Sequence, residues 1–295
     1  MKRPLILALA WLASAAAPAQ APEVFDSTRA WEHLRQQVAI GPRPAGSAGN
    51  LKNRAYITRT LAAIGLKTVE QSWEATTPIG PIKMVNLIAT IPGQRPDRII
   101  LASHFDTKLF REFRFVGASD GASSTATLLE MARVIKARRQ LPFTIELLFL
   151  DGEEATGEWH DPDHTYGSRH YVAVARQTGT LKSLQAMILL DMVGDRQLNI
   201  RREATSTPWL TDIIWNTARR LGHQANFINE SMAVEDDHMH FLKAGIPSVD
   251  IIDLDYPAWH TAQDTLEAVS ARSLQTVGDV MMAALPDIEA RLLKH

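Results

Sequence analysis

Short apolar runs recur along the chain and are rich in Val, Ile and Leu. Their nearly continuous apolar character is typical of central strands that are covered on both faces of a sheet. Five such runs are predicted to be strands: residues 84–91, 98–103, 143–150, 185–191 and 248–252.

The stretches between these runs have apolar residues spaced by three and four positions, which predicts amphipathic helices. Four helices are predicted, at residues 49–65, 122–139, 206–222 and 270–293. Gly65 and Gly222 are stop signals for two of them. Pro286 is a candidate point of interruption in the last one.

Strands that alternate with helices predict an α/β protein, folded as a single-domain three-layer α/β/α sandwich. Ligands of such sheets bind beyond the carboxyl ends of the strands. Acids and histidines follow three of the predicted strands, at His104 and Asp106, at Glu153 and Glu154, and at Asp191. We therefore expect these polar groups to gather at one edge of the sheet.

The first 21 residues have the pattern of a secretory signal peptide. Two basic residues precede an apolar stretch over 5–17, which is too short for an ordinary membrane span, and a small-x-small cleavage site ends at Ala21. We predict a signal peptide over 1–21, a catalytic domain over 22–295, and export to the periplasm or medium. No stable membrane insertion is expected after cleavage; the alternative is an uncleaved anchor.

Composition narrows the possible functions. The 295 residues carry a formal net charge of −2, which gives no indication of a nucleic-acid-binding surface. The chain has no cysteine, which excludes disulfides, a cysteine nucleophile and thiolate metal ligands. A chain of this size can bury a core without such cross-links. No pattern in the sequence selects an oligomeric state.

A metal site could be built from residues in three predicted loops. A catalytic zinc site needs three protein ligands and one open position, and Asp120, Glu154 and His260 would supply that set. Each residue alone also has a plain structural interpretation: Asp120 could cap the helix that follows it, for example. The remaining acids would then support the ligands or act as a general base.

The neighbouring acids Glu153 and Glu154 follow a predicted buried strand directly. Adjacent residues of an extended chain point to opposite faces, so both side chains reach one site only if the backbone turns there. Gly152 permits such a turn. One glutamate would then bind the metal while the other moves protons beside the open position.

Motifs that carry a family resemblance run through nearly the whole chain after residue 40. They are "GPRPAGS" (41–47), "SHFDTK" (103–108), "FVGASDGAS" (115–123), "FLDGEEA" (149–155), "YGSRH" (166–170), "LLDMVG" (189–194), "EDDH" (235–238) and "WHT" (259–261). With these motifs the chain resembles the animal-type, zinc-dependent glutaminyl-peptide cyclotransferases. That family belongs to the zinc aminopeptidase-like superfamily.

The resemblance implies a fold, a cofactor and a base. The fold would have a central, mixed, mostly parallel, twisted sheet. Asp120, Glu154 and His260 would bind one zinc ion. Glu153 matches the glutamate that shuttles protons in the family.

The resemblance also implies residues that contact the substrate. Asp191 and Asp236 match acids that orient the substrate and steady its developing charges during catalysis. Trp159 and Trp259 match aromatic walls of the substrate pocket, and Tyr256 is a further candidate for its lining. The implied reaction converts the N-terminal glutamine of a peptide or protein into pyroglutamate and releases ammonia.

A rival interpretation is an aminopeptidase that uses two zinc ions. His104 and Asp191 would complete the second metal site, with Asp120 bridging, and Glu153 would activate water. The ligand set does not separate the two activities, but the tryptophans and Lys108 favour the cyclase. A third interpretation is a catalytically inactive, peptidase-like binding domain, and the intact set of ligands argues against it.

Three departures from the animal pattern leave the substrate preference open. Glycine follows Asp120, as in many aminopeptidases, and Asp250 stands where animal cyclases tend to have histidine. Ser103 lies where secreted animal members have one cysteine of a pair. The other histidines, including His164 and His238, are not assigned as ligands and are expected to be surface or core residues.

Overall fold

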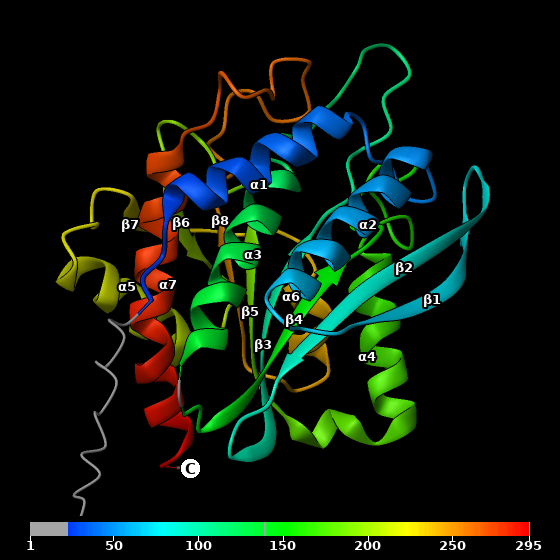
Figure 1. Cartoon of the computed structure of the whole chain (residues 1–295). Helices are drawn as coiled ribbons and strands as arrows, with labels where there is room; N and C mark the ends of the chain where they lie inside the picture. The colour runs from blue at the N-terminus through cyan, green and yellow to red at the C-terminus, as the bar shows by residue number, and fades with distance from the viewer. Residues whose placement is uncertain (1–22, 139, 295) are drawn as a thin grey trace, which may run out of the picture.

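A six-stranded sheet runs through the centre of the computed structural model, which describes residues 23–138 and 140–294 (Figure 1). The strands follow the order β1-β2-β4-β3-β5-β8. Their bounds are β1 (Thr68–Thr77), β2 (Gly80–Ile91), β3 (Arg95–His104), β4 (Phe143–Leu150), β5 (Leu184–Asp191) and β8 (Ser248–Ile252). Strands β4, β3, β5 and β8 are parallel, whereas β1 and β2 join antiparallel. The mixed, mostly parallel sheet is thus confirmed.

All five predicted strands are present, and three further strands were not predicted. The edge strand β1 has the sequence TVEQSWEATT, whose polar and charged residues give no apolar run. It pairs along its whole length with β2, which supplies the apolar contacts that β1 lacks. A second, two-stranded parallel sheet is formed by the short strands β6 (Ile200–Glu203) and β7 (Phe227–Met232).

Helices cover both faces of the main sheet, as the three-layer prediction requires (Figure 1). One face is covered by α1 (Ser27–Ile40), α2 (Ala48–Ala63), α3 (Ala122–Ala137), α5 (Pro208–Arg220) and α7 (Ala271–Leu292). The other face is covered by α4 (Tyr166–Thr178), the short 3-10 turn η1 (Thr180–Ser183) and α6 (His238–Lys243). Each layer buries its own apolar cluster against the sheet.

The four predicted helices are present, and α1, α4 and α6 were not predicted. The candidate interruption at Pro286 does not occur, because α7 continues through it to Leu292. Leu285 and Ile288 are buried beside the proline in the main core. This burial stabilises the helix against the lost backbone hydrogen bond that a proline normally causes.

The parallel strands bring their carboxyl ends to one edge of the sheet. His104, the last residue of β3, is paired in register with Leu150 of β4, and Asp191 of β5 is paired with Ile252 of β8. The loops after these strands therefore start side by side, although they are far apart in sequence. The predicted signal peptide over 1–21 lies outside the described residues. Among those described, no helix has the length and apolar character needed to cross a membrane.

Candidate active site

A cavity of about 530 Å³ is lined by residues at the carboxyl ends of β3, β4, β5 and β8 and by the segment that follows β7. Trp159 and Trp259 line it and are 40% and 44% exposed. His260 and Lys108 also line it, and so do five buried acids: Asp120, Glu153, Glu154, Asp191 and Asp236. A second cavity of about 570 Å³, near Trp209 and Arg291, has neither an acid nor a histidine in its lining. The chemistry is therefore concentrated in the first cavity.

The backbone after β4 makes the turn that the glutamate pair requires. Gly152 has φ of 71°, and a Cβ atom there would come within 2.5 Å of the Met84 sulfur. Asp106 then accepts hydrogen bonds from the backbone N–H groups of Glu153 (3.2 Å) and Glu154 (3.3 Å). This turn, held by one buried carboxylate, places both glutamate side chains in the cavity.

Asp120, Glu154 and His260 meet at one point. The Nε2 atom of His260 lies 3.3 Å from Asp120 Oδ2 and 3.2 Å from Glu154 Oε1. One ligand atom from each residue lies within 4.8 Å of the other two. Asp120 Oδ2 and Glu154 Oε2 are buried oxygens whose nearby cationic groups are His260 Nε2 at 3.3 Å and Lys108 Nζ at 4.0 Å, respectively. Two such carboxylates beside an imidazole suit a metal ion.

The loop that carries Asp120 is fixed by a residue that the sequence did not single out. Asp264 accepts hydrogen bonds from the backbone N–H groups of Ser119 (2.7 Å) and Asp120 (3.1 Å). The Tyr256 hydroxyl donates to the same carboxylate at 2.6 Å. Tyr256 is only 3% exposed and is not among the cavity-lining residues, so its expected place in the pocket is wrong. It supports the Asp120 loop from behind instead.

Asp120 does not cap α3. The residue before the helix is Gly121, with φ of 85°, and no side chain caps this end. A Cβ atom at Gly121 would come within 2.5 Å of the Asp106 carbonyl oxygen. The glycine that follows Asp120 is therefore required by this close approach. The Asp120 carboxylate faces His104 and His260 instead of capping the helix.

His260 is held among aromatic rings. Its ring centroid is 4.4 Å from Trp259, 5.6 Å from Phe110 and 5.9 Å from Phe115. Its own backbone has a positive φ of 52°, which is uncommon for a residue with a side chain. The two phenylalanines were missed by the sequence, because nothing in a loop sequence tells which distant histidine it will contact.

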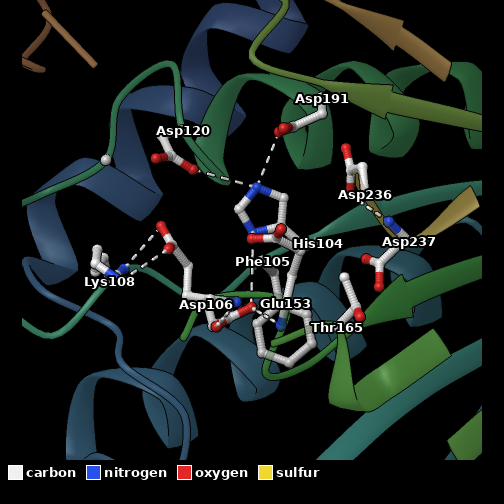
Figure 2. A network of polar contacts seen from close by, with 12 residues as sticks. His104, Phe105, Asp106, Lys108, Asp120, Glu153, Thr165, Asp191, Asp236 and Asp237 are labelled. Carbon is white, nitrogen blue, oxygen red and sulfur yellow. Dashed lines mark hydrogen bonds and ion pairs between the residues drawn. The ribbon is translucent and has the colours of Figure 1, made fainter. Parts of the chain in front are cut away.

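A second set of possible metal ligands shares Asp120 with the first. His104 Nε2 lies 2.9 Å from Asp191 Oδ1 and 3.3 Å from Asp120 Oδ1, as Figure 2 shows. Ligand atoms of His104, Asp120 and Asp191 also lie within 4.8 Å of one another. The other ring nitrogen, Nδ1, lies 3.6 Å from Asp106 and 3.8 Å from Glu153. The residues named for the two-metal alternative are thus close enough to serve it.

The charges at the first set of ligands call for a cation. Burial lowers the pKa of His260, but hydrogen bonds to Asp120 and Glu154 outweigh it and raise that pKa to about 10. Burial and the negative charge of Asp120 raise the pKa of Glu154 to about 7. A positive charge at this point is therefore strongly favoured, either as a proton on His260 or as a metal ion.

Further buried acids occupy the other side of the cavity. Burial raises the pKa of Glu153 well above its ordinary value; the charge of His104 opposes this rise, and the charges of Asp236 and Glu154 add to it. Burial and Asp191 raise the pKa of Asp236 to about 6. Behind Asp236 lies Asp250 of β8, fully buried, with no hydrogen-bond partner for either carboxylate oxygen.

The buried acids continue away from the cavity through His238. Its Nδ1 atom lies 3.8 Å from Asp250, and its Nε2 atom lies 3.1 Å from Glu203. His238 is buried, so the expectation of a surface or core histidine holds. Glu203 was missed, because an acid inside a short strand looks like any solvent-facing residue in the sequence.

Lys108 steadies the loop of the glutamate pair (Figure 2). Its backbone N–H donates to Glu154 Oε1 at 3.1 Å, and its Nζ lies 4.0 Å from Glu154 Oε2. The same Nζ donates to the carbonyl oxygens of Ala155 (3.2 Å) and Gly157 (3.4 Å). The lysine therefore links Glu154 to the segment that leads to Trp159.

Comparison with known proteins agrees with this geometry. The model of Peptidase family M28 matches residues 86–285. A glutaminyl-peptide cyclotransferase-like protein of Bos taurus is 32% identical over 270 residues, which cover 81% of this chain and 70% of that protein. An Acidobacteriales bacterium glutaminyl cyclase has a TM-score of 0.88 at 41% identity, over 94% of this chain and all of that one.

A leucine aminopeptidase precursor from Bacteroides thetaiotaomicron is also similar, with a TM-score of 0.81 at 27% identity over 90% of this chain and 98% of that one. The fold is thus common to both chemistries, and the higher identities lie with the cyclases. The chain belongs to peptidase family M28 and, within it, to the glutaminyl cyclases.

Proposed function

We propose that this protein cyclises the N-terminal glutamine of peptides and proteins to pyroglutamate and releases ammonia. The observation that carries the proposal is the position of Glu153. It lines the same cavity as Asp120, Glu154 and His260, beside the two exposed walls Trp159 and Trp259. The likeness to cyclases over most of the chain supports the same reaction.

We propose zinc as the metal. A nitrogen ligand from His260 and oxygen ligands from Asp120 and Glu154 form a donor set that zinc accepts, and three protein ligands leave one position open. Zinc bound there would supply Lewis-acid polarisation of the substrate's γ-carbonyl group.

Glu153 is the residue we assign to proton transfer. The α-amine nitrogen of the substrate attacks the γ-carboxamide carbon, and the bond from that carbon to the amide nitrogen breaks. The Glu153 carboxylate takes one proton from the attacking amine and gives it to the departing nitrogen, which leaves as ammonia. Burial raises the pKa of this carboxyl well above its ordinary value, which makes it a stronger base than a solvent-exposed glutamate and suits it to proton transfer.

The remaining cavity residues would hold the substrate in a reactive shape. Cyclisation needs the amine and the carboxamide of one glutamine side by side, so a bent conformer has to be selected. Trp159 and Trp259 would restrict the glutamine between flat walls and exclude water. Asp191 and Asp236 line the same cavity and would orient the amine and amide through hydrogen bonds.

An aminopeptidase is the second candidate, and a specific observation favours it. His104, Asp120 and Asp191 form a second set of possible ligands, as a two-metal peptidase would need. Glu153 would then take a proton from water. The two candidates differ in the number of metal ions and in the bond that is broken.

One experiment separates these candidates. Purified protein is loaded with zinc, its zinc content is measured, and a glutamine-peptide and a leucine anilide are offered as substrates with and without a chelator. We expect one zinc per chain, chelator-sensitive ammonia release and negligible anilide hydrolysis. Two zinc ions per chain with efficient anilide hydrolysis would identify the peptidase instead.

We also propose export, which rests on the leader-like sequence of residues 1–21 alone. Substrates would then be peptides and proteins outside the cytoplasm that begin with glutamine. Fractionation of cells that make the tagged chain, with and without residues 1–21, tests this. Equal cytoplasmic retention of both forms would refute it.

A further inference from the structure

The cavity wall formed by Trp159 rests on a buried imidazole ring. The rings of Trp159 and His164 are stacked, with centroids 4.3 Å apart and planes 10° apart. His164 is only 2% exposed, whereas Trp159 is 40% exposed and lines the cavity. His164 lies outside the metal ligands and the acids described above, so the catalytic scheme leaves it without a role.

His164 is anchored to the backbone of the general base. Its Nδ1 atom lies 3.0 Å from the Thr165 hydroxyl, which also lies 2.9 Å from Nε2 of His240. The backbone N–H of Thr165 donates to the carbonyl oxygen of Glu153 at 2.7 Å. The platform beneath Trp159 is therefore tied to the residue that moves protons.

The other ring nitrogen of His164 faces one acid from each of two neighbouring segments. His164 Nε2 lies 3.8 Å from Asp161 Oδ1 and 3.9 Å from Glu235 Oε2. Glu235 lines the cavity and directly precedes Asp236. The ring thus lies between the segment of Trp159 and the segment of Asp236.

We propose that His164 is a positioning residue that holds Trp159 as a substrate wall. It acts on the binding of the glutamine residue and leaves the chemical step unchanged. This inference rests on the proposed cyclase function, because it assigns a task within the same cavity.

Its surroundings favour the neutral form of the His164 ring. Burial lowers the pKa of His164, against the opposing charges of Glu235 and Asp161. Arg169 lowers the pKa further, Asp163 raises it slightly, and His240 faces the ring only through the Thr165 hydroxyl. Protonation below the ordinary range of histidine would add attraction to Asp161 and Glu235.

Three substitutions of His164 test this inference in the zinc-loaded enzyme with a glutamine-peptide. His164→Ala and His164→Gln remove the flat ring, and we expect the KM to rise about three- to tenfold, as for the loss of one aromatic stack. We expect kcat to stay within about twofold, because the Glu153 carboxylate and the metal ligands are untouched. His164→Phe restores a flat ring and is expected to restore the KM.

His170 provides a matched control. It stacks on Trp73 with centroids 4.2 Å apart and planes 11° apart, and neither residue lines the cavity. His170→Ala therefore removes an equivalent stack and is expected to leave the KM unchanged. An increase in the KM of this variant equal to that of His164→Ala would assign the effect to general loss of stability.

Tryptophan fluorescence gives a readout that a purely structural role would not move. A protonated imidazole quenches a stacked indole. The part of the emission that Trp159→Phe removes should therefore decrease on acidification of the parent, at a pH below the ordinary pKa of histidine. It should stay constant with pH in His164→Phe.

The inference is overturned if His164→Ala keeps the parental KM, if kcat falls as much as kcat/KM, or if His164→Phe is as impaired as His164→Ala. A parent enzyme that does not cyclise glutamine at all would instead overturn the proposed function. In that case the pH-dependent emission of Trp159 still reports whether the stack exists.

Discussion

Two sides of one cavity each contain a buried carboxylate, but the surroundings shift the pKa of the two groups in opposite directions. Asp120 and Glu153 are both buried carboxylates. Burial would raise the pKa of Asp120, but hydrogen bonds to His104 and His260 lower it below the ordinary value. Glu153 has no such pair of histidine partners; burial and the nearby acids raise its pKa well above the ordinary value. Asp120 is therefore kept in the anionic form that a metal ion needs, whereas Glu153 is suited to carry a proton.

The difference teaches that neighbours assign the role of a carboxylate here. Glu153 and Glu154 are adjacent in sequence, and Asp106 accepts a hydrogen bond from the backbone of each. Of these two glutamates, only Glu154 lies within hydrogen-bond distance of His260. The first three predictions below each change one side of this comparison, and the fourth changes a buried acid outside the cavity.

Glu153→Gln removes the proton carrier and keeps the size of the side chain. We expect kcat for glutamine-peptide cyclisation to fall about 10²- to 10⁴-fold, because general acid–base catalysis is lost. Zinc content should equal that of the parent. Steady-state kinetics together with metal analysis check this, and nearly full activity with zinc bound would refute the role of Glu153.

Glu154→Gln is the same change one residue later and should act on the metal. We expect zinc affinity to fall by at least about 100-fold, since even residues behind a ligand contribute about 10- to 100-fold. Competition with a chelator measures the affinity. Activity should recover partly at high zinc concentration, in contrast to Glu153→Gln; equal zinc affinity in both variants would contradict the assignment.

Asp264→Asn should weaken the metal site indirectly. The two carboxylate oxygens of Asp264 now accept from the backbone N–H groups of Ser119 and Asp120. In the variant, an NH₂ group replaces one of these oxygens, and two donors cannot pair. The Asp120 loop therefore loses one hydrogen bond. We expect zinc to bind about 10- to 100-fold more weakly. Tyr256→Phe is the control, because it removes only the hydroxyl that donates to Asp264, and it should have the smaller effect.

Asp253→Asn tests how a buried acid outside the cavity makes the free energy of unfolding depend on pH. Burial raises the pKa of Asp253 to about 7, against about 3.9 for an unfolded aspartate. Between these values the folded state binds more protons than the unfolded state, so the contribution of Asp253 to stability decreases as pH rises from about 4 to about 7.

We therefore expect the free energy of unfolding of Asp253→Asn to depend less on pH than that of the parent. Urea unfolding of the metal-free proteins at pH 5 and pH 8 measures this, and an unchanged pH dependence would contradict the raised pKa. Zinc affinity and kcat should change least in this variant, because Asp253 touches no metal ligand and no cavity-lining acid.

The elements that the sequence predicted were those with strong local patterns. Central strands such as β4 are entirely buried, so their apolar runs are unambiguous. The edge strand β1 was missed because most of its side chains are at least partly exposed. Helix α4 was missed because its buried face includes Gly167 and Ser168, which interrupt the apolar spacing that marks a helix.

Within the site, the sequence identified residues whose type and position after a strand are informative. Asp264, Phe110 and Phe115 were missed because their importance comes from contacts with distant residues. Asp264 is 144 positions from Asp120, whose backbone it holds. Tyr256 was misplaced for the same reason: the family resemblance suggested the pocket lining, but its hydroxyl donates to Asp264.

By itself the sequence determined which acids, histidines and tryptophans stand at the strand ends, and where glycine allows the backbone to turn at Gly152. Local chemistry is sufficient for these features. Only the tertiary structure decided which carboxylate faces His260, which one is left to carry protons, and that His164 lies beneath Trp159. The first two depend on contacts between segments far apart in sequence, such as the 3.2 Å between His260 and Glu154. The third depends on the folding of the loop after β4, which stacks the two rings with centroids 4.3 Å apart. Charge interactions and stacking both weaken as the groups move apart.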